Sequence, residues 1–369
     1  MRSGTSFSTQ DVVKKFNGSG DTTFGWLQTA CVIAFALVAT LVWSILDRRR
    51  REYRTLHEAL RILVRLVLAW ALLSYGSVKL LQTQFPPPSP SQLLERVGDE
   101  SPMGLLWTFM GASTAYNVFA GLGEAVPGLL LFFRRTTTLG ALLAAAVMSN
   151  VVMLNMAYDV PVKIYSSQLL LYAAFLALPD ARRLANVLVL NRPAPAAPGR
   201  APFQKRWLVW GHRLARVFMV GFVVYTCASQ AHEGWKTYGA GKAQPDLYGV
   251  YKVETLTRDG EAAPKSDASR WLSVAFEGDG SVRIGRGNEE RTWYKTDGEP
   301  SKEGFVLQEQ KDDEATGPKI PVSYTRPDAE HLTLEGTFDG VRVHAELVKK
   351  KFELLNRGFH WVNEAPYNR

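Results

Sequence analysis

Cysteine is scarce in this 369-residue chain: Cys31 and Cys227 stand singly in separate apolar runs. Without a CxxC pair or a Cys/His cluster, the sequence offers neither a thiol-redox motif nor a zinc site of the usual spacing. A basic stripe interleaved with aromatic residues is also missing, so we expect no nucleic-acid partner. No cofactor motif is evident. What the chain does have is a strongly uneven distribution of apolar residues.

The average composition hides a division of the chain into two parts. Mean hydropathy is -0.08 and 46% of the residues are hydrophobic, as in many soluble proteins. Yet almost all long apolar runs precede residue 230, whereas residues 229–369 are polar and rich in turn signals. The net charge of +8 comes largely from short arginine clusters beside the apolar runs. Such clusters orient membrane helices and meet anionic lipid headgroups.

Six apolar runs approach the length of about 20 residues that a helix needs to cross the hydrocarbon layer. The first run is followed by DRRRREYR and lacks a small-residue cleavage site, so we interpret it as a retained span and not as a signal peptide. The predicted membrane-spanning helices are 26–46, 59–81, 108–133, 137–158, 163–180 and 207–228.

The distribution of Lys and Arg orients these spans. Basic residues concentrate in the loops 47–58, 134–136 and 181–206, whereas the loops on the opposite side contain only Arg96 and Lys163. The positive-inside rule therefore predicts a multi-pass protein of the bacterial inner (cytoplasmic) membrane with both termini in the periplasm.

This topology predicts six segments, which share the alternation of membrane and exposed parts. They are an N-terminal periplasmic tail (1–25), a first span with a basic cytoplasmic loop (26–58), a four-helix membrane core (59–185), a Pro/Ala-rich linker (186–206), a last span (207–228) and a periplasmic β domain with an aromatic tail (229–369).

The third span has the most informative polar pattern. Ser113, Asn117, Gly121 and Glu124 follow helical spacing and line one face. A carboxyl group half-way through a span is costly and faces a bundle interior or a water-filled cavity. We therefore expect Glu124 to be functional.

Other polar residues fall in the outer half of the predicted spans. Together with Glu124 they predict an outward-facing pocket, which the loop 82–107 could cover as a lid. The predicted pocket residues are Tyr75, Lys79, Asn117, Asn150, Asn155, Asp159 and Lys163.

Each pocket residue also has a structural interpretation. Tyr75 fits an interfacial belt, the asparagines fit interhelical hydrogen bonds, and Lys79 alone fits a snorkelling anchor. The estimated depths of Lys79 and Glu124 differ by roughly 12 Å, so Asp159 or Asn117 is the expected partner of Lys79 rather than Glu124.

Residues 66–180 contain the stretches YGSVKLL, GLGEAVPGLLLFFRR and LGALLAAAVMSNVVMLN. In these stretches the chain resembles the DoxX family of small membrane proteins. The resemblance implies a four-helix bundle, and because some DoxD-like relatives belong to a thiosulfate:quinone oxidoreductase, it implies a quinone-linked redox role with quinone as a possible cofactor. It carries over Lys79 and Glu124 as site residues. The first and last spans and the C-terminal domain lie outside this pattern.

From residue 246 onward the sequence alternates with a period of two. Asp339-Gly340 is a two-residue hairpin turn, and about eight short antiparallel strands predict a small all-β barrel or sandwich. His331, His344 and His360 lack paired spacing, so we expect no metal site. The tail NRGFHWVNEAPYNR could dock on the membrane or cap the pocket, but packing beneath the barrel through Phe359 and Trp361 is the favoured interpretation.

Three functions remain open from the sequence. The first is a redox-associated membrane protein in which Glu124 relays a proton and Lys79 holds a carbonyl or anionic group of a quinone-like molecule. The second is a non-enzymatic envelope assembly protein whose β domain recruits a periplasmic protein. The third is a small-solute transporter, against which the lack of inverted repeats argues.

Overall fold

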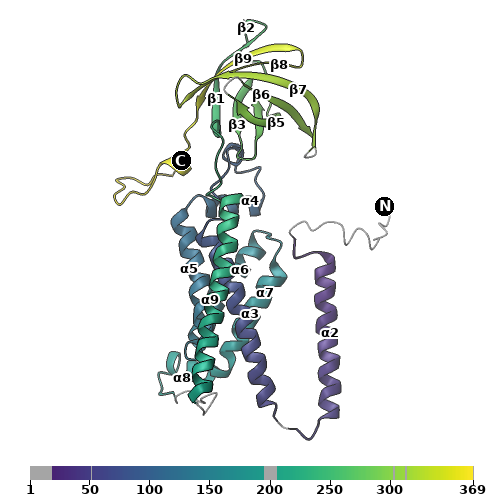
Figure 1. Ribbon diagram of the computed structural model, residues 1–369, viewed down its shortest axis with the longest axis vertical. Coiled ribbons are helices and arrows are strands. Elements are labelled where there is room, and N and C mark those ends of the chain that lie inside the picture. Colours follow the sequence, from purple (N-terminus) through teal and green to yellow (C-terminus); the bar gives the residue numbers. More distant parts are fainter. Residues whose placement is uncertain (1–18, 51, 195–205, 302–303, 312–313, 369) are drawn as a thin grey trace. The chain divides into compact units, whose positions relative to one another are not determined.

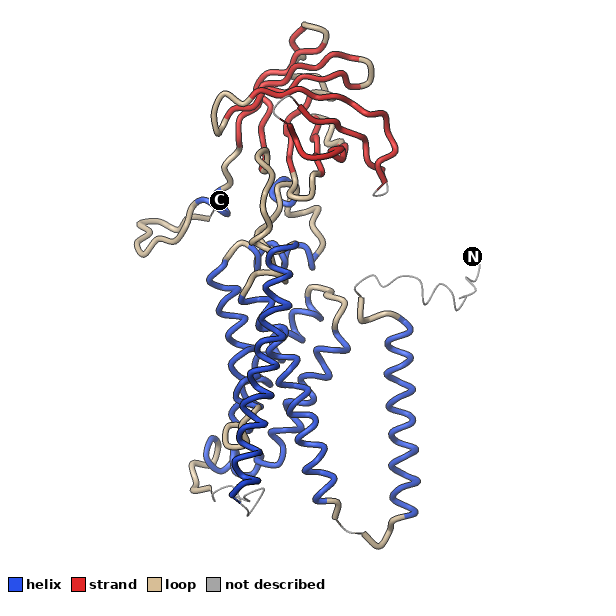
Figure 2. The backbone as a smooth tube through the Cα atoms, in the orientation of Figure 1, coloured by secondary structure: helices blue, strands red, loops and turns tan. Residues whose placement is uncertain are grey.

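The computed structural model describes residues 19–50, 52–194, 206–301, 304–311 and 314–368 (Figures 1 and 2). Most of the predicted tail 1–25, and residues 195–205 of the predicted linker, lie outside them. The chain forms two compact units. The helical unit comprises Met1–Gln84 and Thr114–Trp235, and the barrel unit comprises Phe85–Ser113 and Lys236–Arg369.

Helices make up the first unit. A bundle of four packs side by side in the order α3, α5, α6 and α7, and this ring closes because α7 also contacts α3. Outside this bundle, helix α2 has no buried residue. The helices are α2 (Thr23–Leu46), α3 (Arg54–Leu80), α5 (Thr114–Leu131), α6 (Thr137–Ala157), α7 (Lys163–Ala177), η2 (Leu178–Asp180), α8 (Ala181–Leu188) and α9 (Arg206–Thr237).

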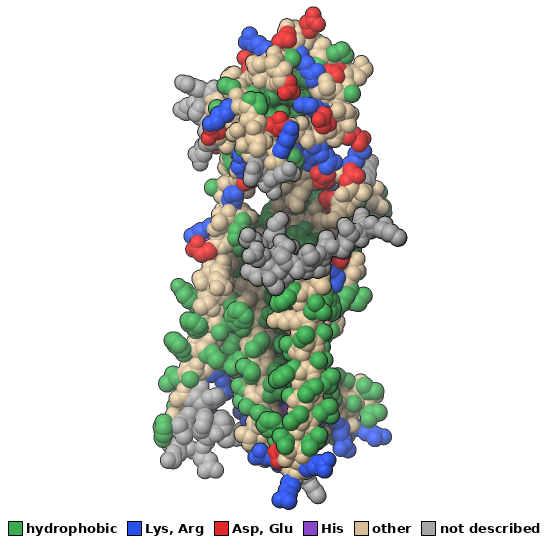
Figure 3. All heavy atoms as spheres, turned by 90° about the vertical axis from the view of Figure 1, so that its right-hand side faces the viewer, with side chains coloured by type: hydrophobic (Ala, Val, Ile, Leu, Met, Phe, Trp, Pro, Cys, Tyr) green, Lys and Arg blue, Asp and Glu red, His purple; other side chains and the backbone are tan. Residues whose placement is uncertain are grey.

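Four helices in the described part of the chain are long and apolar enough to cross a membrane. They are α2, α3, α6 and residues Val209–Thr237 of α9. Figure 3 shows apolar side chains covering one face of the helical unit, with Lys and Arg gathered at the end where α2 and α3 are joined. A membrane-type helical half is thus confirmed. The six-span count stays a prediction, because α5 and the 15-residue α7 are not among the four.

The predicted span 108–133 is not one helix. It is divided into α4 (Pro102–Gly111), which belongs to the barrel unit, and α5, which begins at Thr114. The Ser101 hydroxyl accepts a hydrogen bond from the Gly104 N–H and caps α4, with Pro102 at its first position. A separately capped short helix therefore replaces the outer part of the predicted span.

Small residues allow α3 and α5 to pack with their backbones close together. A Cβ atom on Gly121 would lie 2.9 Å from the Gly76 carbonyl oxygen, and one on Gly76 would lie 2.9 Å from the Gly121 carbonyl oxygen. Further along the same interface, Gly128 lies against the Ala69 carbonyl oxygen. Such small-residue contacts are typical of helix packing in membranes.

The second unit contains a closed antiparallel barrel of eight strands. The strands follow each other in sequence order, and pairing of β9 with β1 closes the sheet, while the short β2 extends beside β1. The closed sheet confirms the predicted barrel and rules out the alternative of a sandwich of two sheets. The strands are β1 (Gly249–Arg258), β2 (Glu261–Ala262), β3 (Trp271–Phe276), β4 (Ser281–Arg286), β5 (Arg291–Ser301), β6 (Gly304–Lys311), β7 (Glu314–Thr325), β8 (His331–Phe338) and β9 (Val341–Lys349).

The barrel interior is packed with its own apolar side chains. Tyr251, Leu256, Ile284, Leu332 and Leu347 are fully buried within one continuous cluster. Inward-facing residues alternate along the strands, and the β-bulge between Val253 and Thr255 shifts this alternation by one residue in β1. The barrel is therefore a rigid support with a filled core.

The loop after α3 packs on the outside of this barrel. The buried Arg283 guanidinium on β4 donates to the Ser91 carbonyl oxygen and to Glu95 Oε1, both at 2.9 Å. Arg291 donates to the other Glu95 oxygen at 2.6 Å, and the Ser91 N–H donates to Glu277 at 2.7 Å. The segment between these contacts contains a single 3-10 turn, η1 (Gln92–Leu94). These contacts make the loop part of the barrel unit, so its prediction as a lid has no structural support.

The C-terminal segment leaves the barrel after β9 and a short helix, α10 (Glu353–Asn356). The favoured interpretation, that Phe359 and Trp361 pack beneath the barrel, is wrong: their exposed fractions are 77% and 91%. The physical reason is that the strands already fill the barrel core.

We predict that Gly121→Ala destabilises the helical unit by about 1–3 kcal/mol, because its methyl group would collide with the backbone of α3. Thermal unfolding in detergent measures the effect. Gly123→Ala is the matched control, since a Cβ there meets its nearest neighbour at an ordinary 3.7 Å. Equal midpoints for the two variants would contradict the close α3–α5 packing.

Candidate functional site

A buried ion pair joins α3 to α5. Lys79 Nζ lies 2.9 Å from Glu124 Oε1 and 2.8 Å from Oε2, so the ammonium group donates to both carboxylate oxygens. The side chains are only 9% and 4% exposed. The sequence-based expectation that these residues lie too far apart is therefore wrong, and Asp159 pairs with Lys163 instead of Lys79.

Three features of the fold bring the pair together. Because α5 begins at Thr114 rather than at residue 108, Glu124 is nearer the start of its helix than the predicted span implied. Side chains in a helix also lean toward its N-terminus, so Lys79 extends back along α3. The Gly76–Gly121 contact lies one helical turn before Lys79 and Glu124 and brings the axes of α3 and α5 close enough for the two side chains to meet.

Polar and aromatic groups surround the pair. Lys79 Nζ lies 5.5 Å from the centre of the Tyr75 ring, which lies 6.0 Å from the Tyr165 ring of α7. Asn117 on α5 is fully buried. The predicted face of Asn117, Gly121 and Glu124 is thus buried in the bundle, whereas Ser113 is exposed and precedes α5.

Gln82 was not among the predicted pocket residues. It lies three residues after Lys79, just beyond the end of α3, and has a φ of 50°, in the left-handed region that non-glycine residues seldom adopt. Its Oε1 accepts a hydrogen bond from Thr114 Oγ1 at 3.3 Å, while the buried Nε2 has no hydrogen-bond partner. The only signal in the sequence was a glutamine just past the apolar run.

The other predicted pocket residues form separate contacts. Asn155 donates to Ser166 Oγ at 3.0 Å, which supports its interpretation as an interhelical hydrogen bond. Asn150 is exposed. Lys163 pairs with the exposed Asp159 at 2.7 Å. These four residues therefore do not share the site of Lys79 and Glu124.

Asp21 is a second residue that the sequence analysis missed. Its carboxylate accepts hydrogen bonds from the backbone N–H groups of Lys163, at 2.7 Å, and Ile164, at 3.0 Å. A carboxylate at the first N–H groups of a helix satisfies donors that have no partner within the helix. The segment before α2 is thereby fixed to the start of α7.

The Lys79–Glu124 pair places two opposite charges in an apolar interior, where burying them costs free energy. A polar ligand that accepts a hydrogen bond from Lys79 would compete with Glu124 for the ammonium group. The pair could equally hold two helices together, and the two roles differ in what happens when both charges are removed.

The barrel histidines form contacts with carboxylates. His331 Nδ1 lies 2.8 Å from Asp328, and this hydrogen bond raises the pKa of the imidazole. Backbone N–H groups of Glu330 and His331 lower the pKa of Asp328 to about 2. His344 contacts Glu335. Among the described residues, no group of three His, Cys, Asp or Glu side chains could hold a metal ion.

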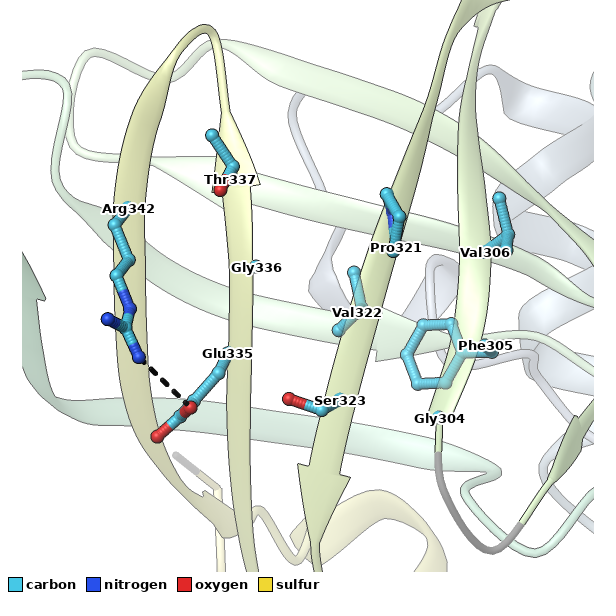
Figure 4. A pocket seen from close by; sticks show the side chains of 10 residues that line it. All are labelled: Gly304, Phe305, Val306, Pro321, Val322, Ser323, Glu335, Gly336, Thr337 and Arg342. Carbon is cyan, nitrogen blue, oxygen red and sulfur yellow. Dashed lines mark ion pairs between the residues drawn. The ribbon is translucent and has the colours of Figure 1, made fainter.

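The barrel surface has a hollow of about 550 Å³ across β6 to β9 (Figure 4). The β7–β8 ladder runs only from Thr325 to Val322, next to Pro321, which has no N–H to donate. The exposed Glu335–Arg342 ion pair lies on one side of the hollow, and Phe305 and Val306 lie on the other. This combination of apolar and charged groups suits a peptide or protein segment.

Comparisons with known proteins give limited information. No family model matches the chain, and no solved structure matches it. The chain is 27% identical over 143 residues to the uncharacterized protein YwoB of Bacillus subtilis (strain 168). The match covers 39% of this chain and 91% of that protein, so almost the whole relative corresponds to less than half of the present chain.

We predict that Glu124→Gln destabilises the protein by about 3–5 kcal/mol, because it leaves the Lys79 charge buried without its carboxylate. The double variant Lys79→Met/Glu124→Leu should unfold close to the parent, since it removes both charges and keeps apolar volume. Thermal unfolding of both variants tests this. A double variant as unstable as Glu124→Gln would show that the pair itself stabilises the fold.

Proposed function

We propose that the helical unit is embedded in the bacterial inner membrane and binds a small amphipathic, quinone-like molecule at the Lys79–Glu124 pair. The observation that carries this proposal is the burial of a complete ion pair between two apolar helices. Charged groups at such positions are rare and mark ion, proton or ligand sites. The resemblance to the DoxX family supports quinone as the ligand class.

Three groups have suitable chemistry for a carbonyl-containing ligand. Lys79 is a hydrogen-bond donor whose present acceptor is Glu124. Gln82 Nε2 is a buried donor without a partner, three residues after Lys79 and just beyond the end of α3. A quinone oxygen could accept from either group, and Glu124 could exchange the proton that accompanies reduction. The electrons would come from a separate donor, because the chain has no cofactor motif.

The aromatic residues favour a planar ligand over a simple ion. Tyr75 and Tyr165 present neighbouring rings close to Lys79. Aromatic rings of this kind stack on planar groups with centres about 4.5–7 Å apart. The ligand class is therefore a ring carbonyl with an apolar tail that the bilayer accommodates.

A second candidate function is an envelope assembly protein whose barrel recruits a periplasmic partner. The surface hollow across β6 to β9 favours it, because its apolar floor and the Glu335–Arg342 pair suit a polypeptide (Figure 4). This function would tolerate the loss of Glu124.

We predict that a quinone-like molecule co-purifies with the protein in native nanodiscs and is depleted in Lys79→Met/Glu124→Leu. Native mass spectrometry measures the bound molecule. The double variant is preferred because it keeps the fold without leaving a buried charge. Asp159→Asn is the matched control: it removes the carboxylate of another lysine pair in the same unit, but at an exposed position.

Depletion in the double variant, with retention in Asp159→Asn, supports a ligand site at the ion pair. The same generic lipid profile in the parent and in both variants contradicts it. In that case the pair is a structural contact, and the barrel surface becomes the candidate functional site.

A further inference from the structure

The C-terminal residues 357–367, here called the tail loop, have a defined local structure. Arg357 donates to Asn363 Oδ1 at 2.6 Å, and its guanidinium carbon lies 4.1 Å from the centre of the Tyr367 ring. Gly358 has a φ of 72°, which glycine adopts without strain. Arg357, the first residue of the tail loop, thus contacts both its middle and its last residue.

The tip of the tail loop is apolar and exposed. Phe359 and Trp361 contact each other edge to face with ring centres 5.0 Å apart, and Val362 follows them. All three side chains are directed away from other parts of the chain, as their high exposure shows. Trp and aromatic residues with polar neighbours are enriched at the membrane–water interface.

The tail loop follows the end of the barrel at which the chain enters from α9, a membrane-type helix. The Lys350 N–H donates to the Val250 carbonyl oxygen at 2.8 Å, so β9 ends beside the start of β1. Residues 238–248 connect this start to α9, which contains a candidate membrane span. A connection of this length reaches at most roughly 40 Å when extended. The tail loop and the membrane surface are therefore within reach of each other.

A second apolar element of the same unit has a fixed connection to the bundle. The helix α4 exposes Leu105 and Phe109, and it ends two residues before α5 begins. The ten-residue α4 is too short to span a bilayer, which requires about 20 residues. The barrel unit thus carries two exposed apolar segments. The helix α4 is joined directly to α5, and the tail loop follows the end of β9, beside the strand start that residues 238–248 join to α9.

From these observations we propose that the tail loop inserts Phe359, Trp361 and Val362 into the outer lipid–water interface and so anchors the barrel to the membrane surface. The occupant is lipid, because the tip combines exposed aromatic residues with a basic and amide-containing base, as interfacial segments do. The inference rests on the membrane placement in the proposed function, but not on the ligand.

Site-specific fluorescence quenching tests the anchor. The native cysteines are removed by Cys31→Ala and Cys227→Ala, and a fluorophore is attached to the new thiol of Trp361→Cys. The labelled protein is reconstituted in phosphatidylcholine nanodiscs. A doxyl group near the lipid headgroup is the quencher. Leu272→Cys is the negative control, because Leu272 is exposed and lies toward the end of β3 remote from the Gly249–Phe276 pair. A separate protein with only Cys227→Ala, labelled at the native Cys31 that is exposed on α2, is the positive control.

We expect lipid quenching at position 361 comparable with that at Cys31 and absent at position 272. Quenching at Cys31 without quenching at 361 overturns the anchor while leaving the proposed function intact. A label at 361 that is shielded from both the lipid quencher and aqueous iodide also overturns it, because protein then covers the tip. Absence of quenching at Cys31 would overturn the membrane placement on which both proposals depend.

Discussion

The ion pair between Lys79 and Glu124 sets the strictest requirement on this fold. Two opposite charges can stay in an apolar interior only when each is within hydrogen-bond distance of the other. That distance requires α3 and α5 to approach closely, which in turn requires glycine at positions 76 and 121. A larger residue at either glycine would separate the helices and leave both charges unpaired. Packing and electrostatics at this interface therefore depend on each other.

The barrel is linked to these same helices through the order of the chain. The segment Phe85–Ser113 belongs to the barrel unit but lies in sequence between α3 and α5, the helices that carry the pair. Arg283 and Arg291 hold this segment through Glu95. The barrel is consequently tied to the chain on both sides of the ion pair as well as through α9.

Local sequence patterns were sufficient for several parts of the structure. The period-two alternation and the Asp339-Gly340 turn predicted the barrel strands, because inward-facing residues of a small barrel must be apolar. The helical spacing of Asn117, Gly121 and Glu124 predicted a buried face. The partner of Glu124 was not predictable in the same way. The depth of Glu124 was counted along one continuous span. The chain instead forms a separate helix, α4, capped by Ser101, and α5 begins only at Thr114.

Contacts between distant segments were beyond the sequence. Nothing near Arg283 indicates that it binds Glu95, and nothing near Asp21 indicates that it caps α7, since both partners are far away in the chain. The exposure of Trp361 was also missed, because an aromatic chain end suggested packing when the barrel core had no remaining space. In each case the decisive information is how much room other segments leave, which composition and spacing do not contain.

The central claim is that Glu124 is a chemically active group and not only a helix contact. Infrared difference spectroscopy tests this directly: a short-chain quinone is added to the protein in nanodiscs, and the carboxyl bands that disappear in Lys79→Met/Glu124→Leu are assigned to Glu124. The account predicts that quinone binding shifts or protonates this carboxylate. A spectrum in which the Glu124 bands stay unchanged at saturating quinone would contradict it.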